Sequence, residues 1–426
     1  MTILVFLASL LGSMAIGVPV AFALMFCGIV LMTYMGIFNT QIVAQNMIEG
    51  ANTFTLLAIP FFLLAGELMN QGGLSKRIIG FAISFVGHRK GGLGFVAIIA
   101  AVIMASLSGS AAADTAALAS ILIPMMRDAG YNVPRSAGLI AGGGIIAPVI
   151  PPSIAFIIFG VAANVSITQL FLAGIVPGLL LAVALLITWQ IVAGKDDVAT
   201  LPKQDWKQRL TATGRAGWAL LMPVIILGGI RFGVFTPTEA AVVAAVYALF
   251  VGMFIYRELK LSDLYGVLLR AAKTTSVVLF LVAAALVSAW LITSANIPAE
   301  IGGMIRPLIE NPKLLMLAIM LLVLVVGTAL DLAPTILILT PVLMPIIREA
   351  GIDPVYFGVM FVINTCIGLI TPPVGIVLNV VSGVARVPLG KVIGGVWPFL
   401  LAQVGVLLLL VMFPELVLVP LKWLRG

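Results

Sequence analysis

Long apolar runs separated by short polar segments dominate this chain of 426 residues. The clearest runs cover residues 171–192, residues 277–292 with their flanks, and residues 314–330. About 20 consecutive apolar residues are enough for a helix to cross a bilayer. The pattern therefore predicts an all-α polytopic membrane protein.

Residues 104–153 contain two features that are foreign to an ordinary membrane helix. A tip of small and polar residues lies between apolar runs, and the helix-like segment that follows is broken in its middle. The tip contains Ser106, Ser108, Gly109, Ser110, Asp114 and Thr115, and the break contains residues 142–144 (all glycine), Pro148, Pro151 and Pro152. Breaks in hydrocarbon occur only where protein or a watery cavity satisfies the backbone. Paired breaks of this kind indicate the substrate and ion site of a transporter.

The same stretch recurs in the second half of the chain. The segment IPMMRDAG (123–130) is echoed by MPIIREAG (344–351), so that Pro124 matches Pro345 at a shift of 345 − 124 = 221. At this shift the Pro-Pro pair at 151–152 meets the pair at 372–373, and the Gly and Pro at 174 and 177 meet those at 395 and 398. Three separate matches at one spacing predict two copies of one module.

The recurrence also predicts the organisation of the chain. We expect repeat 1 to cover 1–194 and repeat 2 to cover 218–426, each with scaffold helices, an amphipathic arm, a re-entrant hairpin and a broken helix. The predicted arm, hairpin and broken helix are 72–90, about 94–126 and about 135–162 in repeat 1, and 257–273, about 314–346 and about 357–384 in repeat 2. The polar connection 195–217 holds five of the 23 Lys and Arg residues, which predicts a cytoplasmic position.

Composition agrees with a membrane protein and excludes several other classes. The chain is 62% hydrophobic and 9% charged, whereas soluble chains are roughly a quarter charged. The net charge of +7 is explained by basic cytoplasmic loops, so no nucleic-acid partner is expected. Cys27 and Cys366 lie in apolar segments and indicate neither disulfides nor a transition-metal site. The apolar start has no charged segment before it, so no cleaved signal peptide is expected.

Hairpin tips that stop within a membrane suit the binding of ions. Where a half-helix ends, unpaired carbonyls suit Na⁺; where one begins, unpaired N–H groups and a positive dipole end suit an anion. Hydroxyl groups add ligands, and glycine lets backbones approach closely. We therefore predict two pseudo-equivalent sites, each formed by a hairpin tip and the break in the following helix.

Other interpretations of these residues remain open. Small residues are also typical of close helix packing, and Asp114 and Asp331 are also suited to capping a half-helix. A proton-coupled carrier that works without a binding protein would use Asp331 or Glu67, although Glu67 is unexceptional if it lies at the membrane edge. An intramembrane hydrolase would use Asp114 and Asp331 as a dyad. A passive channel would need a selectivity filter, which no segment indicates.

Six segments resemble one transporter family along the whole chain. They are LLAIPFFLLAGELMNQGGLSKRI, MASLSGSAAADTAA, GGGIIAPVIPPS, FTPTEAAVVAA, DLAPTILILTPVLMP and GLITPPVG. The sequence resembles the large membrane (DctM-type) permease subunit of TRAP (tripartite ATP-independent periplasmic) transporters. It is most similar to the free-standing large subunits for sugar acids of the 2,3-diketogulonate type.

The resemblance implies a fold and a transport mechanism. The fold would be the ion-transporter-superfamily type, with two inverted repeats and a transport domain that moves as an elevator. The protein would not be an enzyme and would have no cofactor; Na⁺ would drive uptake of a small organic acid across the bacterial inner membrane. Its partners would be a small four-helix membrane subunit, expected as a separate chain, and a periplasmic substrate-binding protein.

The resemblance also assigns site residues. Sodium site 1 would contain Ser106, Ser108, Gly109, Ser110, Gly144, Pro148 and Pro151. Sodium site 2 would contain Gly327, Thr328, Asp331, Thr335, Thr365, Gly368, Thr371 and Pro372. The substrate would contact Ser110, Asp114, Thr115, Pro152, Pro334, Thr335 and Pro373. Because Ser110 aligns with Asp331 (331 − 110 = 221), the two sodium sites need not have equal affinity.

Overall fold

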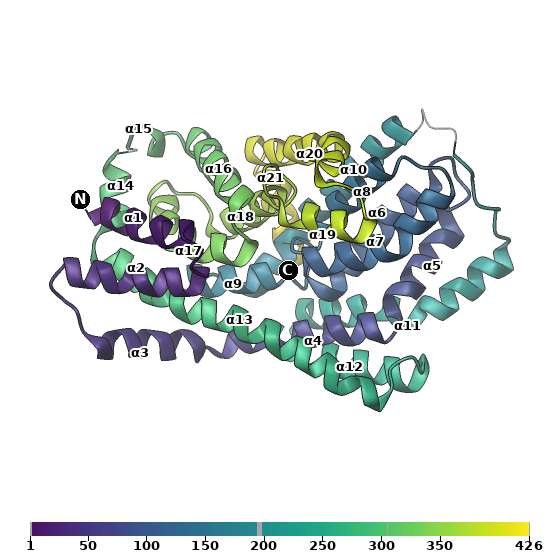
Figure 1. The fold of residues 1–426 in the computed structure, drawn as a ribbon, viewed down its shortest axis with the longest axis horizontal. Coiled ribbons are helices and arrows are strands. Elements are labelled where there is room, and N and C mark those ends of the chain that lie inside the picture. The colour runs from purple at the N-terminus through teal and green to yellow at the C-terminus, as the bar shows by residue number, and fades with distance from the viewer. Residues whose placement is uncertain (1, 194–197, 305, 426) are drawn as a thin grey trace.

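The apolar runs form helices throughout the described residues of the computed structural model, which are 2–193, 198–304 and 306–425 (Figure 1). The first half contains α1 (Thr2–Ala15), α2 (Val20–Tyr34), α3 (Thr40–Ala51), η1 (Phe54–Leu57), α4 (Ala58–Gln71), α5 (Leu74–Val86), α6 (Gly92–Ser108), α7 (Ala111–Asp128), α8 (Val133–Gly144), α9 (Ile154–Ala163) and α10 (Ile167–Ala193). The second half contains α11 (Trp206–Arg231), α12 (Pro237–Phe250), η2 (Val251–Ile255), α13 (Leu261–Ser294), α14 (Ile297–Met304), α15 (Arg306–Ile309), α16 (Pro312–Ala329), α17 (Leu332–Glu349), α18 (Pro354–Gly368), α19 (Ile376–Ala385), α20 (Leu389–Met412) and α21 (Glu415–Arg425).

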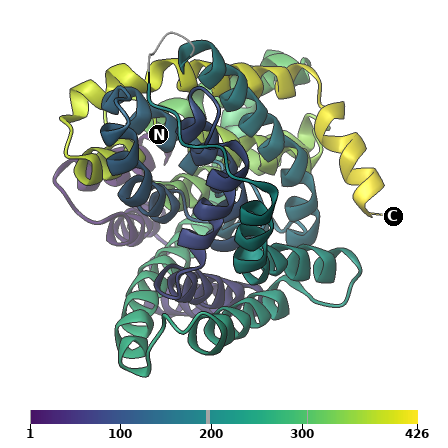
Figure 2. The same cartoon turned by 90° about the vertical axis from the view of Figure 1, so that its right-hand side faces the viewer.

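The length and composition of the helices define an all-helical polytopic membrane protein. Within the described ranges, eight helical segments are long and apolar enough to cross a bilayer. Several shorter apolar helices accompany them, among them α6, α9, α18 and α19. Figure 2 shows the C-terminal α21 extending from the edge of the molecule.

Helices that border the predicted tips and breaks recur at the shift found in the sequence. The second hairpin helix begins at Ala111 in the first half and at Leu332 in the second, a shift of 332 − 111 = 221. Helices α6 and α7 correspond to the predicted hairpin 94–126, and α16 and α17 to the hairpin 314–346. The predicted broken helices correspond to α8 with α9 and to α18 with α19.

The two halves pack against each other in a crossed manner. Helix α7 of the first hairpin contacts α19 of the second half, and α17 of the second hairpin contacts α9 of the first. Each first hairpin helix contacts the first part of its own broken helix, α6 against α8 and α16 against α18. In Figure 1 these helices lie above a layer that contains α3, α4, α12 and the long α13.

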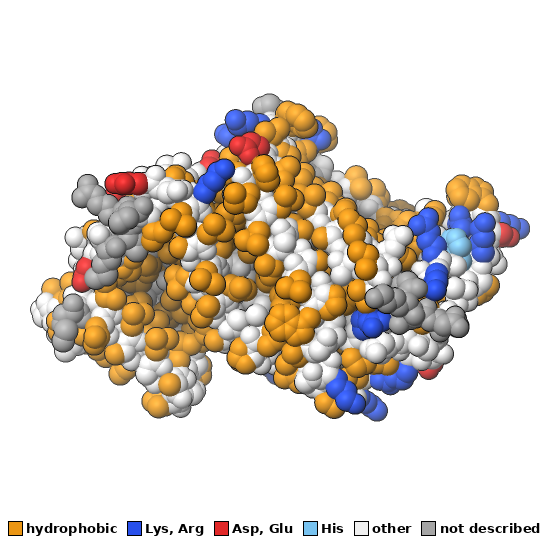
Figure 3. All heavy atoms as spheres, turned by 90° about the horizontal axis from the view of Figure 1, so that it is seen from above, with side chains coloured by type: hydrophobic (Ala, Val, Ile, Leu, Met, Phe, Trp, Pro, Cys, Tyr) orange, Lys and Arg blue, Asp and Glu red, His pale blue; other side chains and the backbone are white. Residues whose placement is uncertain are grey.

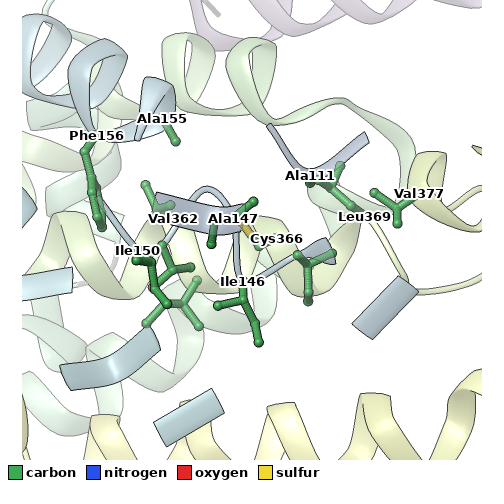
Figure 4. Close-up of a cluster of buried hydrophobic side chains, with 14 of the residues drawn as sticks. Ala111, Ile146, Ala147, Ile150, Ala155, Phe156, Val362, Cys366, Leu369 and Val377 are labelled. Carbon is green, nitrogen blue, oxygen red and sulfur yellow. The ribbon is translucent and has the colours of Figure 1, made fainter. Parts of the chain in front are cut away.

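The core between the two breaks is apolar and comes from both halves. Figure 4 shows Ile146, Ala147 and Ile150 from the first break facing Val362 and Cys366 of α18. Phe159 of α9 packs at 6.0–6.1 Å between ring centroids against both Phe357 and Phe361 of α18. This packing brings the two irregular segments together at the centre of the molecule.

The arms differ from the prediction. Residues 261–273 of the predicted arm 257–273 and the apolar run after it are one helix, α13, which has no proline to end it. Hydroxyl groups of Thr274 and Ser276 donate to backbone carbonyls one turn earlier, so these polar residues fit inside the helix. At the shift of 221, the start of α13 corresponds to α3, a helix that the sequence patterns did not reveal. The first predicted arm, 72–90, contains α5, which packs between α6 and α11.

The second half of the predicted connection 195–217 is helical. Residues 195–197 lie outside the described residues, and α11 begins at Trp206 within the polar stretch. Asp205 accepts a hydrogen bond of 2.7 Å from the Gln208 backbone N–H, and the Gln208 side chain accepts one of 2.9 Å from the Asp205 N–H. This capping box starts the helix twelve residues before the apolar run that follows residue 217.

Candidate functional site

The tip of the first hairpin is organised by Ser108. Its hydroxyl donates a hydrogen bond of 2.5 Å to Asp114 Oδ1 and accepts one of 3.2 Å from the Ser110 N–H. Between them, Gly109 adopts a left-handed conformation with φ +62°. A side chain at Gly109 would place its Cβ 2.5 Å from the Pro152 carbonyl oxygen, so the glycine lets the tip lie directly against the first break.

Two buried oxygen atoms on the first turn of α7 lack a partner among the described residues. They are Asp114 Oδ2 and Thr115 Oγ1. Asp114 faces the tip through Ser108, whereas Thr115 lies so close to α8 that a Cβ on Gly144 would be 1.8 Å from its Oγ1. Leaving a buried polar group unpaired costs about 1–3 kcal/mol, and more for a charged group. A bound cation would remove that cost.

The second hairpin meets its break through two glycines. A Cβ on Gly368 would lie 2.7–2.8 Å from Gly327 backbone atoms, so α16 and α18 touch backbone to backbone. Thr365 is fully buried beside this contact and donates to the Phe361 carbonyl oxygen at 2.8 Å. Carbonyl and hydroxyl oxygens therefore gather where α16 meets α18.

Asp331 occupies the position that Ser110 holds in the first tip. Its Oδ1 accepts a hydrogen bond of 2.8 Å from the Leu332 N–H and caps α17. Its backbone carbonyl accepts a bond of 2.8 Å from the Thr335 hydroxyl. Asp331 is exposed, whereas Thr335 is fully buried.

The remaining predicted residues separate into a buried set and a more open set. Ser106, Pro148, Pro151 and Pro152 of the first half are buried, as is Pro334 of the second. Thr328, Thr371 and Pro372 are half-buried, and Pro373 is exposed. The first predicted sodium site is thus buried apart from the half-buried Ser110, whereas the second includes half-buried and exposed residues.

A cavity of about 170 Å³ lies between the two tips and the two breaks. The first residues of four helices line it: Ala111 of α7, Ile154 of α9, Leu332 of α17 and Ile376 of α19. Each helix N-terminus carries about +0.5 of an elementary charge. Ser110, Ser153 and Asp331 each accept a hydrogen bond from one backbone N–H of α7, α9 and α17, which satisfies only part of the N–H groups of each first turn. Among the described residues no Lys or Arg lines this cavity, so the dipoles are its source of positive potential.

The cavity contains only part of the predicted substrate set. Of those seven residues, all within the described ranges, Ser110 alone lines it; Gly109, Pro148 and Asp331 of the predicted sodium sites also do. Leu63 of α4 and Thr274 and Val278 of α13 close the opposite side. We did not predict these three from the sequence, although a Thr-Thr-Ser run at 274–276 marks this part of α13.

Asn364 is a further polar residue outside the predicted set. It is fully buried on α18 and donates from Nδ2 to the Met320 carbonyl oxygen of α16 at 2.5 Å. Its Oδ1 has no partner among the described residues. It directly precedes Thr365 and offers another oxygen where α16 meets α18.

Glu67, the carboxylate considered for proton coupling, forms an ion pair. Its Oε2 accepts a hydrogen bond of 2.8 Å from Arg270 Nε. The pair joins α4 to α13 and lies outside the cavity between the tips. This arrangement gives Glu67 a local structural contact.

Fold and site together define a polytopic helical permease whose two hairpin tips meet at one internal cavity. The family model for the DctM component of the tripartite ATP-independent periplasmic transporter matches residues 7–416. The chain belongs to this family and is therefore the large permease subunit of a bacterial TRAP transporter, a multi-pass membrane protein and not an enzyme.

Curated relatives agree with this membership, and a solved structure shares the fold. The 2,3-diketo-L-gulonate TRAP transporter large permease protein YiaN of Escherichia coli is 55% identical over 425 residues, covering 100% of both chains. The sialic acid TRAP transporter large permease protein SiaM of Vibrio cholerae is 41% identical, covering 96% of each. The crystal structure of the Alcanivorax borkumensis YdaH transporter has the same fold, with a TM-score of 0.61 at 16% identity over 90% of this chain and 88% of that one.

Proposed function

We propose that this subunit imports a small organic acid, either a carboxylate or a sugar acid, driven by a sodium gradient. The single observation that carries the proposal is the meeting of four helix N-termini at the cavity between the tips. Such termini bind carboxylates without a basic side chain. The names of YiaN and SiaM give acids as substrates, which supports the same chemical class. A volume of about 170 Å³ favours a small acid, because drug-sized ligands occupy about 300–1,000 Å³.

Sodium would bind where each hairpin meets its break. In the first half, the unpartnered oxygens of Asp114 and Thr115 support a buried site beside Ser108 and Gly144. In the second, the close approach of Gly327 to Gly368 and the Asn364 oxygen support a more open site. Filling the two sites would neutralise nearby carboxylates and thereby favour the binding of an anion.

Transport would proceed as an elevator between two inverted repeats. The recurrence of helix boundaries at one shift, and the crossed pairing of α7 with α19 and α17 with α9, support the repeats. The tips and breaks would form the moving domain, and α2, α3, α4, α12 and α13 would belong to the scaffold. The packing of α13 against α2, α3 and α4, and of α12 against α4, supports this division.

Membership of a tripartite system supports two protein partners in the bacterial inner membrane and periplasm. A small membrane subunit on a separate chain would enlarge the scaffold. A periplasmic substrate-binding protein would deliver the acid to the cavity.

Uptake by proteoliposomes tests the proposal. The chain and its small subunit would be reconstituted, and entry of radiolabelled organic and sugar acids followed with and without a sodium gradient and the binding protein. Uptake that needs both supports the proposal and identifies the substrate. Uptake without the binding protein indicates a conventional carrier, and uptake that follows a pH gradient but ignores sodium indicates proton coupling, for which Asp331→Asn is the diagnostic variant.

A further inference from the structure

A second and larger cavity lies between α5 and α11, away from the tips. Its volume is about 590 Å³, within the range of about 300–1,000 Å³ for ligand sites. It is lined by basic and hydrogen-bonding side chains, including Lys76, Arg77, Gln204, Lys207, Thr211 and Arg215. Figure 3 shows that Lys and Arg side chains gather at this end of the molecule, around the single histidine.

One of the four cations is already neutralised. Arg77 pairs with Glu258 at 2.6 Å, donates to the Gly73 carbonyl oxygen at 3.0 Å and lies 3.8 Å from the Tyr256 ring centroid. These contacts hold Arg77 in the cavity wall, and the ion pair with Glu258 neutralises its charge.

The other three cations remain available. Lys76, Lys207 and Arg215 are exposed, and among the ion pairs of the described residues none involves them. Further positive charge lies near the cavity, around His88. Desolvation lowers the pKa of His88, and the neighbouring charges of Arg209, Lys203 and Arg89 lower it further. A cavity with three uncompensated positive charges is complementary to an anion.

Exposed aromatic and apolar residues beside the cavity indicate that it adjoins a membrane interface. Arg215 is followed on α11 by Trp218, which is 44% exposed, and by the exposed Leu221. Three residues of helix rise only about 4.5 Å, so the basic cavity and the interfacial tryptophan occupy adjacent levels. Anionic lipids of the cytoplasmic leaflet attract basic side chains at this level.

The fold of the repeat does not require basic residues at the positions of Lys76 and Arg77. At the shift of 221, Lys76 and Arg77 of α5 correspond to Ile297 and Pro298 of α14. The corresponding helix therefore forms without a basic pair, which leaves the basic residues of α5 free to serve a ligand.

We propose that the cavity between α5 and α11 binds the phosphate group of an anionic phospholipid. Lys76 and Lys207 supply ammonium groups, Arg215 supplies a guanidinium, and Gln204 and Thr211 offer further hydrogen bonds to phosphate oxygens. The acyl chains extend along the exposed apolar face of α11 near Trp218 and Leu221. This site is distinct from the cavity between the tips, and its ligand does not depend on the identity of the transported acid.

Binding of dioleoyl-phosphatidylglycerol to the full chain in detergent, measured by native mass spectrometry, tests the site. The variant Lys76→Gln/Lys207→Gln/Arg215→Gln should weaken binding about 100-fold, because each basic residue near a membrane surface contributes about five-fold. The matched control, Lys391→Gln/Lys422→Gln/Arg425→Gln, removes two lysines and one arginine from exposed positions elsewhere and should change the dissociation constant less than about three-fold. Binding of dioleoyl-phosphatidylcholine should be weak and equal in all three proteins.

Four outcomes decide the proposal. Loss confined to the cavity variant supports it, particularly if Lys76→Arg/Lys207→Arg/Arg215→Lys restores binding and so excludes misfolding. An equal loss of lipid binding in both glutamine variants indicates unspecific electrostatic attraction and overturns the proposal. Unchanged lipid binding in both variants also overturns it. Displacement of the lipid by millimolar inorganic phosphate would assign the cavity to free phosphate and overturn the lipid assignment.

Discussion

Ser108 links both ends of the first tip through a single hydroxyl. It holds Asp114 on α7 and the Ser110 N–H in the turn, and it lies against Gly66 of α4. Hydrogen bonds to charged groups contribute about 1.5–3 kcal/mol, so removing this hydroxyl releases Asp114 from its fixed orientation. The residue is therefore placed to affect the proposed sodium binding, and it does not line the cavity proposed for the transported acid.

Ser108→Ala should raise the sodium concentration for half-maximal uptake about ten-fold or more, because a loss of 1.4 kcal/mol is a factor of ten. Thr335→Ala should raise it by less, since the Thr335 hydroxyl already donates to Asp331. Sodium titrations of uptake measure both. Ser120→Ala is the control, because Ser120 is exposed on α7 and bonds only within its own helix. Unchanged sodium dependence in both test variants, at normal expression, would contradict the two-site assignment.

The three consecutive glycines of the first break should differ sharply in their tolerance of a side chain. A Cβ on Gly144 would collide with Thr115 Oγ1 at 1.8 Å, whereas one on Gly142 would find its nearest atoms at 3.4 Å. We expect Gly144→Ala to lower the free energy of unfolding by about 1–3 kcal/mol and Gly142→Ala to have little effect. Thermal unfolding in detergent measures the difference. Partial recovery in Gly144→Ala/Thr115→Ala would identify the hydroxyl as the cause, and equal stability of both single variants would refute it.

At the scale of helices, two arginines join the hairpins to the opposite half. Arg127 near the end of α7 donates to the carbonyl oxygen of Ala385, the last residue of α19, at 2.7 Å. Arg348 near the end of α17 donates to Ala163, the last residue of α9, at 2.9 Å. The arginines are themselves 221 residues apart (348 − 127 = 221). A cation at a helix C-terminus is stabilised by the helix dipole.

Arg127→Gln and Arg348→Gln should each reduce the stability of the protein by about 1–2 kcal/mol, because each removes a charged hydrogen bond at a helix end. The thermal midpoint in detergent is the measurement. Lys391→Gln, which removes an exposed charge from α20, should leave that midpoint unchanged. If the arginine variants have the same thermal midpoint as the control, the crossed contacts do not stabilise the packing of the two halves.

Several elements could be predicted from local patterns, and others depend on packing. The apolar runs, the tips at Gly109 and Asp331, and the proline-containing breaks are visible because turns and prolines leave short-range signals. The continuity of α13 was not predictable, since Arg270 and Lys273 resemble the end of a helix until Arg270 is seen to pair with Glu67. The cavity residues Leu63 and Val278 could not be predicted either, because an apolar residue that lines a cavity has the same local sequence pattern as one that faces lipid.

At the scale of the whole molecule, the cavity between the tips has two kinds of wall. Residues from the tips and breaks form one side, and Leu63, Thr274 and Val278 of α4 and α13 form the other. Only the first side is built from the duplicated tips and breaks, whereas the second belongs to the layer that contains α13. An elevator would move the first wall past the second and carry the acid with it.

Cysteines at the tips should report that motion. Ala112→Cys and Ala333→Cys place thiols on the two tips at the cavity, and the native Cys27 and Cys366 are 0% and 1% exposed and give little background. Their rates of labelling by a membrane-impermeant maleimide should change several-fold when sodium and substrate are added, because an elevator motion would move the tips from one side of the membrane to the other. Ser262→Cys, at the exposed start of α13, should label at a constant rate because it lies on the proposed scaffold. If the tip cysteines label as steadily as the cysteine at position 262 while uptake proceeds, the hairpins are not the moving part.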